Sequence, residues 1–206
     1  MSICDPIGLG VAGLGRGFML TLPSLRHDPH VRLVACAAPR QASRDAFCAE
    51  FGGTAYADVA QMCADPQLEA VYIATPHQMH RAHAEAAAAA GKHILVDKPL
   101  AISQADADAI VHAANQAGVH LITGPSHSFD QPVEAARRLL DSGQFGQVRM
   151  IHATNYTDFL YRPRRPEELD TNQGGGVIFS QAIHQIDVVR ALMGQPALRV
   201  AAMTGA

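Results

Sequence analysis

Charged side chains are scarce in this chain of 206 residues, in which Asp, Glu, Lys and Arg together make up 17%. The net charge is −3, and basic residues form no long run that would mark a surface for nucleic acid or an anionic membrane. We therefore expect neither of these as a partner. No apolar stretch reaches the length of a membrane-spanning helix, and no basic segment followed by an apolar one opens the chain, so we expect a cytoplasmic protein.

The four cysteines, Cys4, Cys36, Cys48 and Cys63, are not spaced as a C-x-x-C pair. Two of them fall within segments of strand or helix character, which suits buried thiols in a reducing compartment better than a disulfide framework. Hydrophobic residues make up 48% of the chain, which also holds 17 glycines. This composition is that of a globular protein with one large domain or two modest ones.

Short apolar runs alternate with helical patterns through the first 124 residues. Most runs are apolar throughout, as expected for parallel strands that are covered on both faces. Asp58 and Ser103 are placed to cap the starts of helices, and Gly91 and Gly118 to end helices. The pattern predicts an α/β fold with a doubly wound, Rossmann-like parallel sheet, whose strands we expect at residues 7–12, 31–37, 54–57, 70–74, 93–97 and 120–123.

A glycine-rich turn follows the first expected strand, and two overlapping segments compete for the G-x-G-x-x-G role. The segment from Gly8 to Gly13 matches the motif residue by residue, but it would place the turn inside the strand. The segment from Gly13 to Phe18 follows the strand and opens a helix, so its backbone N–H groups can face a pyrophosphate. We favour this second segment, although Phe18 stands where its third glycine should be. Contacts with a dinucleotide are expected at Gly13, Gly15, Arg16, Gly17 and Phe18.

The second expected strand ends without the acidic residue that usually binds the adenosine ribose of NAD. Ala38 occupies that position, and Arg40 and Arg44 follow it. These arginines offer guanidinium groups to the 2′-phosphate of NADP, so we expect NAD or NADP as cofactor, with NADP favoured. The alternative is that both arginines are solvated residues in the first turn of a helix.

Asp97, Lys98 and Pro99 follow the fifth expected strand. In an open α/β sheet, ligands bind at the carboxyl ends of the strands. Pro99 disfavours helical backbone at Lys98, so the lysine is extended and its ammonium can point into a cleft. Lys98 is thus a candidate catalytic residue, although a lysine at the end of a strand is more often structural or solvated.

Thr75 and Pro76 end the fourth expected strand, and a helix with three histidines follows. His77, His80 and His83 lie on one side of that helix, but no carboxylate or cysteine joins them, and we expect no metal site. We expect Thr75, Pro76 and His80 to help form the cofactor pocket and His83 to be solvated.

The pattern changes at Gly124 and Pro125, where we place a domain boundary. Residues 1–124 are expected to form the dinucleotide-binding domain, and residues 125–206 an incomplete substrate and oligomerisation domain. In this second domain we expect helices at 131–142 and 177–193 and strands at 147–155 and 198–203. The first of these strands is half polar, as in an antiparallel sheet with one face in water.

Three arginines, Arg162, Arg164 and Arg165, alternate with Pro163 and Pro166 just before two glutamates, Glu167 and Glu168. We call residues 162–166 the arginine loop. Planar guanidinium groups bind carboxylates through paired hydrogen bonds, so this loop is a candidate site for an acidic substrate. The alternative is a solvated interface segment that proline stiffens.

A run of three glycines at 174–176 leads into the last expected helix. Ser180, His184 and Asp187 share one stripe of that helix. A single histidine on a helix is usually structural, but the glycine-rich lead and the partner motif at Lys98 make His184 a second catalytic candidate.

Taken in order, these motifs resemble the Gfo/Idh/MocA oxidoreductases. The resemblance spans nearly the whole chain and rests on Gly13-x-Gly15, Thr75-Pro76 with His80, Gly91-Lys92-His93 running into Asp97-Lys98-Pro99, and Gly174-Gly175-Gly176 leading to His184-x-x-Asp187. Within the family, segments 126–130, 158–170 and 179–181 are similar to phthalate 4,5-cis-dihydrodiol dehydrogenases.

The resemblance implies a nucleotide-binding domain followed by an α/β domain whose mostly antiparallel sheet mediates assembly into a homo-oligomer. Lys98 matches the family's catalytic lysine, and His184 matches the histidine that faces the nicotinamide. Three positions depart from the family: Asp97 replaces glutamate, Ser180 stands where many members have an acid, and Ala38 replaces the ribose-binding acid. The chain also stops after the opening strands of its second domain, so we expect it to be part of a longer protein.

We therefore expect a nicotinamide-dependent oxidoreductase that transfers a hydride from a secondary alcohol, a cis-dihydrodiol of an aromatic dicarboxylate, to NAD(P). Lys98 and His184 are the expected proton acceptors, and Asp97 orients or neutralises the lysine. The arginine loop, Ser180 and His184 are expected to bind this small-molecule substrate. The alternatives are a sugar or cyclitol dehydrogenase that uses the same residues, and a non-catalytic nucleotide-binding, regulatory or truncated relative.

Overall fold

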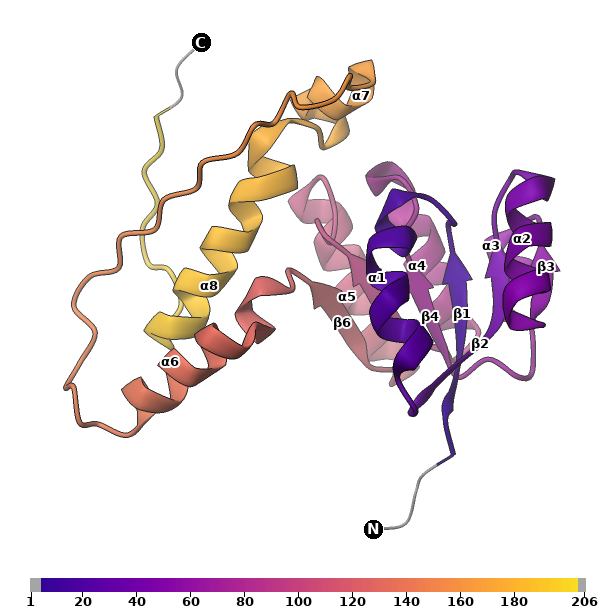
Figure 1. Cartoon of the computed structure of the whole chain (residues 1–206), viewed down its shortest axis with the longest axis horizontal. Coiled ribbons are helices and arrows are strands. Elements are labelled where there is room, and N and C mark those ends of the chain that lie inside the picture. The colour runs from indigo at the N-terminus through magenta and orange to yellow at the C-terminus, as the bar shows by residue number, and fades with distance from the viewer. Residues whose placement is uncertain (1–4, 204–206) are drawn as a thin grey trace.

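The structure is a computed structural model of the chain and describes residues 5–203, so Cys4 lies outside the described residues. Figure 1 shows a parallel sheet surrounded by helices and, beside it, a smaller second part made of helices and long extended segments. The two parts meet at the edge where the strands end. A bilayer-spanning helix is not found between residues 5 and 203.

Six parallel strands form the sheet, in the order β3-β2-β1-β4-β5-β6. The chain builds outward from β1 to β3 and then returns to the other side of β1, as a doubly wound fold does. The strands are β1 Ile7–Ala12, β2 Val31–Ala37, β3 Thr54–Tyr56, β4 Ala70–Ile73, β5 His93–Asp97 and β6 Leu121–Gly124. The predicted parallel sheet is confirmed, and no strand end differs from the prediction by more than about one residue.

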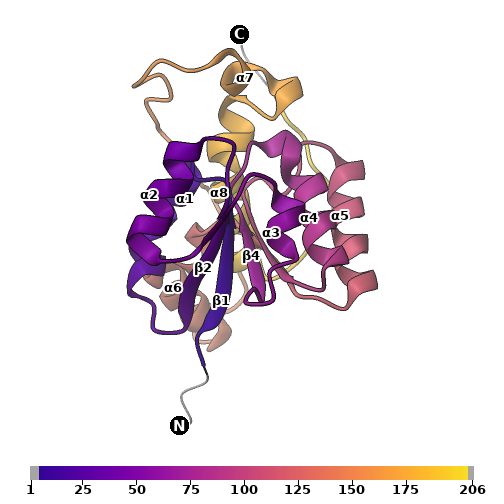
Figure 2. The same cartoon turned by 90° about the vertical axis from the view of Figure 1, so that its right-hand side faces the viewer.

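Helices cover both faces of the sheet, and each face has its own hydrophobic core (Figure 2). Phe18 and Leu22 of α1 and Phe47 of α2 are buried on one face. Met62 of α3 and Ile110 of α5 are buried on the other, together with small residues of α4. The helices are α1 Arg16–His27, α2 Gln41–Phe51, α3 Val59–Cys63, α4 His80–Ala89 and α5 Gln104–Ala117, with a 3-10 turn, η1, at His77–Met79.

Side-chain caps fix the starts of two of these helices. Asp58 accepts a hydrogen bond of 3.0 Å from the backbone N–H of Gln61 at the start of α3. At the start of α5, the Ser103 hydroxyl accepts a bond of 3.1 Å from the Asp106 backbone N–H and donates one of 2.7 Å to the Asp106 carboxylate. Gly118, with φ of 66°, ends α5 in the left-handed conformation. The predicted caps are therefore confirmed. They satisfy polar groups that the end of a helix leaves unpaired.

The second part contains η2 His127–Phe129, α6 Gln131–Asp141, α7 Pro166–Leu169, η3 Thr171–Gln173, the π-helical turn η4 Ile178–Ala182, and α8 Ile183–Met193. Helices α6 and α8 pack on each other and on η2. The helix predicted at 131–142 is confirmed, and so is the one at 177–193, with π-helical winding at its start.

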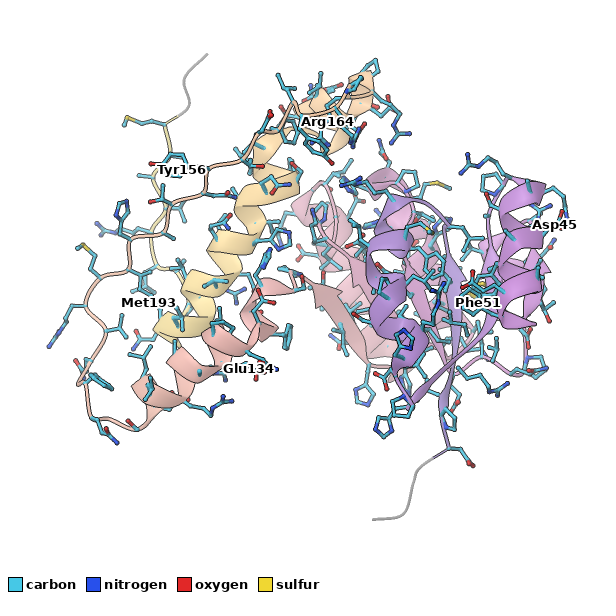
Figure 3. The ribbon with its side chains drawn as sticks, in the orientation of Figure 1. Asp45, Phe51, Glu134, Tyr156, Arg164 and Met193 are labelled. Carbon is cyan, nitrogen blue, oxygen red and sulfur yellow. The ribbon has the colours of Figure 1, made fainter. Side chains whose placement is uncertain are left out.

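The two strands predicted in this part, at 147–155 and 198–203, are not formed, because both segments are unpaired in the described chain. A strand needs a neighbour that supplies partners for its N–H and C=O groups. Within residues 5–203 neither segment has one, and large apolar side chains are exposed there, Met150 at 84% and Leu198 at 91%. Figure 3 shows Tyr156, which directly follows the first of these segments, where the chain passes α8 on the side away from the sheet.

Two neighbouring residues of α5 test the packing of the core. Ile110 is completely buried, whereas Val111 is 43% exposed. We expect Ile110→Ala to lower the free energy of unfolding by about 2–4 kcal/mol, because it leaves a cavity under the sheet. Val111→Ala should change that free energy by less than about 0.5 kcal/mol. Urea unfolding followed by circular dichroism measures both changes, and equal losses would contradict the packing described for α5.

Candidate active site

The carboxyl ends of the parallel strands share one edge of the sheet, and a cavity of about 970 Å³ opens there. The second part forms its other wall. On the sheet side, the predicted site residues that line the cavity are Gly15, Arg16, Gly17, Thr75, Pro76, Asp97 and Lys98. On the opposite wall they are Arg162, Arg164, Arg165, Ser180 and His184.

Glycines shape the turn between β1 and α1. Gly13 has φ of +93°, and a Cβ at this position would lie 2.8 Å from the carbonyl oxygen of Ala74. A Cβ at Gly17 would lie 2.5 Å from the Asp97 carboxylate, so a glycine is needed for α1 to begin beside this acid. Gly15 borders open space. Because the first N–H groups of a helix have no partner within it, this turn fits the pyrophosphate of a dinucleotide.

The competing glycine segment serves packing. Gly8 and Gly10 lie within β1, and both face the loop that precedes β4. A Cβ would come within 2.1 Å of the Gln67 carbonyl oxygen at Gly8 and within 2.7 Å of the Leu68 side chain at Gly10. These two glycines let the loop approach the strand, and the glycine-rich turn that reaches the cavity is the one from Gly13 to Gly17.

Phe18 and Arg40, both expected to contact the cofactor, do not line the cavity. Phe18 is buried in the core, where its ring centre lies 6.2 Å from that of Phe47. Arg40 is exposed at the end of β2, just before α2. Arg44 folds back over the same turn and donates a hydrogen bond of 2.5 Å to the carbonyl oxygen of Ala38. This turn lies at the edge where the adenosine end of a dinucleotide binds in such folds.

The three histidines after β4 each contact an oxygen atom. His80 is completely buried, with its ring nitrogens 2.9 and 3.0 Å from carbonyl oxygens of the turns after β5 and β4, so it supports these turns from behind. His83 was expected to be solvated but is half-buried, and its Nδ1 lies 3.0 Å from the Thr75 hydroxyl. His77 lines the cavity, and its Nδ1 lies 3.2 Å from the Gly174 carbonyl oxygen. Within the described chain, no three His, Cys, Asp or Glu side chains are grouped as metal ligands.

Lys98 connects the two walls of the cavity. Its ammonium donates a hydrogen bond of 2.7 Å to the Ser180 carbonyl oxygen in η4. Such π-helical turns shift the backbone ladder and are frequent at functional sites. Burial lowers the pKa of Lys98, and the neighbouring Asp97 opposes this shift. An amine with a lowered pKa exchanges its proton more readily, as acid–base catalysis requires.

His184 follows Ser180 by four residues and also lines the cavity. Burial, followed by the nearby charges of Lys98 and His127, lowers the pKa of His184 to about 4, so its ring is neutral at neutral pH. Its Nδ1 is buried and has no hydrogen-bond partner in the described chain. The structure thus brings Asp97 and Lys98, at the end of β5, and His184, in α8, into one cavity.

The charges of the arginine loop are largely balanced by two acids that follow it. Glu168 pairs with Arg162 at 2.5 Å and with Arg164 and Arg165 at 3.5 Å, and Glu167 pairs with Arg165 at 3.2 Å. Hydrogen bonds from Arg162 lower the pKa of Glu168 to about 2. Three guanidinium groups and two carboxylates leave a net charge of +1. The loop therefore offers a substrate one unmatched positive charge where the sequence suggested three.

Tyr161 and His127 are among the cavity residues that the sequence motifs did not indicate. Tyr161 accepts a hydrogen bond of 2.8 Å from Arg16, although 145 residues separate the two. His127 lies just after β6, and the rule that pointed to Lys98, a polar residue after the carboxyl end of a parallel strand, would have pointed to it as well. No local pattern could have revealed the contact of Tyr161 with Arg16.

Comparisons with known proteins identify the family of this chain. Residues 7–124 match an oxidoreductase family with an NAD-binding Rossmann fold, and residues 133–206 match the Gfo/Idh/MocA C-terminal domain. The chain belongs to the Gfo/Idh/MocA oxidoreductase family. The family resemblance seen in the sequence is confirmed, and the six-stranded part is its NAD-binding fold.

Several relatives can be compared over most of this chain. The 1-carboxy-3-chloro-3,4-dihydroxycyclohexa-1,5-diene dehydrogenase of Comamonas testosteroni is 52% identical, over 89% of this chain and 47% of its own length. The 1,5-anhydro-D-fructose reductase of Ensifer adhaerens is 34% identical, over 94% of this chain and 58% of its own length. The solved structure of a dehydrogenase-like protein of Bordetella bronchiseptica RB50 is 46% identical, with a TM-score of 0.88 over 92% of this chain and 50% of that one. The chain thus spans about half the length of the relatives that it matches.

Glu168 stabilises the arginine loop in its ionised form, so we expect a specific dependence on pH. Its pKa in the folded chain, about 2, is below the ordinary value of 4.5, so the stabilisation is complete above pH 4.5 and is lost as the pH falls towards 2. Glu168→Gln should lower the melting temperature at neutral pH and make the remaining loss on acidification smaller than in the wild type. Calorimetry of both proteins across this range, with Glu134→Gln on α6 as a control, measures the difference. An unchanged acid sensitivity in Glu168→Gln would refute this role.

Proposed function

We propose that this chain is the nucleotide-binding and catalytic part of an NAD(P)-dependent dehydrogenase whose substrate is a cis-dihydrodiol of an aromatic carboxylate. The observation that carries the proposal is the meeting of Lys98 and His184 in one cavity that begins at the glycine turn after β1. The name of the Comamonas relative, a dehydrogenase of a carboxylated dihydroxycyclohexadiene, supports the same class of substrate.

The residues of the glycine turn would hold the cofactor, with the pyrophosphate beside Gly15 and the start of α1. When bound, the nicotinamide supplies the hydride acceptor for the oxidation of the alcohol. Thr75, Pro76 and His77 border the cavity between this turn and Lys98, and they shape the space in which the nicotinamide ring would lie.

The chain's own residues manage the hydroxyl proton of the substrate. As the carbinol carbon loses a hydride, its O–H bond must break so that the C=O bond can form, and Lys98 or His184 accepts the proton. The lowered pKa of Lys98 makes its free amine available for this step. Asp97 accepts a hydrogen bond of 2.8 Å from the backbone N–H of Lys98, and its charge stabilises the ammonium that results.

The arginine loop supports an acidic substrate. Its net charge of +1 matches one ring carboxylate, and a dicarboxylate would need to displace Glu167 or Glu168 from its partner. Arg164, labelled in Figure 3, has its guanidinium carbon 4.3 Å from the ring centre of Phe159, which fixes the plane in which it can bind a carboxylate. The second candidate substrate is a sugar or cyclitol, which the name of the Ensifer relative supports.

The cofactor we favour is NADP. Ala38 places no carboxylate at the end of β2, where an acid would bind the ribose of NAD and repel a 2′-phosphate. Arg40 is exposed at this point, and Arg44 donates hydrogen bonds to the carbonyl oxygens of the turn. Arg40 is therefore the side chain that we assign to the 2′-phosphate.

We further propose that residues 1–124 bind the nucleotide and that residues 125–206 belong to a substrate domain that also assembles the protein into a homo-oligomer. The limits of the two family matches support this division. Exposed apolar side chains in the extended segments, such as Met150 at 84% and Val200 at 85%, support assembly.

A cytoplasmic location fits the buried thiols of Cys36 and Cys63, whose pKa values burial raises to about 12 and 11.

Replacing Lys98 by alanine tests the proposed chemistry. We expect kcat on a dihydrodiol of benzoate or phthalate to fall by at least about a hundredfold, because general base catalysis is lost, while the Kd for the reduced cofactor changes little. Lys92→Ala is the matched control, since Lys92 lies before the same strand and donates hydrogen bonds only to carbonyl oxygens of the loop before β4. Turnover is measured by nicotinamide absorbance and binding by fluorescence.

Each other outcome of this experiment has a clear meaning. Wild-type rates in Lys98→Ala would remove the lysine from the mechanism. Wild-type turnover of inositol or glucose, but not of the dihydrodiols, would favour the second candidate substrate. Cofactor binding without turnover of any of these alcohols would favour a non-catalytic relative.

Arg40→Ala tests the choice of cofactor. We expect it to weaken the binding of NADPH by about tenfold or more, because a charge-assisted bond to the phosphate is lost, and to leave NADH binding nearly unchanged. Fluorescence titration gives both Kd values, with Arg32→Ala in β2 as a control for the loss of a positive charge. An equal effect on the two cofactors, or tighter binding of NADH by the wild type, would contradict this assignment.

A further inference from the structure

His127 and Asp130 form a pair beside the cavity that the proposed mechanism does not use. His127 begins η2, the turn that follows β6, and lines the cavity. Its Nδ1 lies 2.8 Å from a carboxylate oxygen of Asp130. The two side chains are 51% and 55% exposed. The pair therefore reaches both the cavity and the solvent.

The carboxylate determines which nitrogen of His127 carries a proton. An ionised carboxylate only accepts hydrogen bonds, so Nδ1 of His127 is the donor. In the neutral ring, Nε2 then has a free lone pair and is the atom that accepts a further proton. An imidazole held in this way by an aspartate is the general base of the Ser-His-Asp enzymes. Asp130 thus prepares Nε2 of His127 for proton uptake.

His127 is in edge-to-face contact with His184, with ring centres 4.4 Å apart and planes at 76°. The other charged groups that act on His184 are Lys98 from the end of β5, which disfavours a proton on its ring, and Asp187 and Asp130, which favour one. Burial and the charge of Lys98 have a larger effect on the pKa of His184 than the two carboxylates, and they lower it to about 4. His184 can therefore pass a proton on but does not retain one at neutral pH.

We propose that the Asp130–His127 pair is the proton exit of this active site, receiving the hydroxyl proton through His184 and releasing it to solvent. The proposal rests on the proposed dehydrogenase function. The substrate O–H bond breaks, the hydride goes to the nicotinamide, and the proton passes through His184 to Nε2 of His127 and then to water. The hydroxyl of Ser180, one helical turn before His184, donates its hydrogen to the Gly176 carbonyl oxygen at 2.6 Å instead. His127 and Asp130 act through His184, so both are positioning residues.

The first test does not depend on activity. Long-range ¹H–¹⁵N spectra of the labelled 206-residue chain, recorded at mildly alkaline pH, distinguish the two tautomers of each imidazole. We expect His127 to carry its proton on Nδ1 in the wild type and to lose this preference in Asp130→Asn, because the amide can donate as well as accept. Asp141→Asn, at the exposed end of α6, is the matched control and should leave the spectrum of His127 unchanged. A proton on Nε2 in the wild type, or no change in Asp130→Asn, would overturn the proposal.

The second test measures the effect on turnover. His127→Phe keeps an aromatic ring against His184 but removes the exchangeable proton. We expect kcat to fall by at least about tenfold with KM nearly unchanged, and added imidazole to restore part of the rate. His112→Phe, on the exposed side of α5, is the control for the substitution itself.

These two measurements separate the failure of the proton exit from the failure of the proposed function. If the wild type oxidises dihydrodiols and His127→Phe does so at the same rate, the proton exit is refuted and the dehydrogenase function stands. If the wild type oxidises no alcohol, both proposals fall, and the tautomer spectra still decide whether Asp130 orients His127.

Discussion

The hydrogen bond between the Lys98 ammonium and the Ser180 carbonyl oxygen spans the cavity, and the geometry of both walls depends on it. Its donor is charged and partly buried, so this bond is stronger than a bond between neutral groups. Two further contacts also join the walls. The Nδ1 atom of His77 lies 3.2 Å from the Gly174 carbonyl oxygen, and Arg16 donates a hydrogen bond of 2.8 Å to the Tyr161 hydroxyl. One of the groups that join the two parts of the chain is therefore also the group that we expect to change its charge during catalysis.

The sheet and most of its helices could be predicted because local rules determine them. A parallel strand buried on both faces is a continuous apolar run, so β2 stands out as residues 31–37 without any knowledge of its neighbours. Asp58 and Ser103 mark helix starts through hydrogen bonds that reach only three residues along the chain. Lys98 and His184 could be singled out because one follows such a strand and the other follows a run of glycines.

Contacts between distant segments could not be predicted in this way. The extended segments at 147–155 and 198–203 have the composition of strands, but pairing requires a partner that residues 5–203 do not supply. In the sequence, the arginine loop is a cluster of three positive charges. In the structure, α7 places Glu168 against these arginines, so that most of their charge is balanced. His127 could have been singled out from its place after β6, but its contact with His184 comes from the packing of η2 on α8, which joins residues 57 positions apart.

The chain has two lysines, Lys92 and Lys98, and they lie at opposite ends of β5. Lys92 donates its ammonium hydrogens to two carbonyl oxygens, whereas burial lowers the pKa of Lys98 inside the cavity. Both ammonium groups therefore donate to backbone carbonyl oxygens, but only that of Lys98 does so from a wall of the cavity. A molecule that binds in this cavity and reacts with amines would thus find a single lysine on its walls.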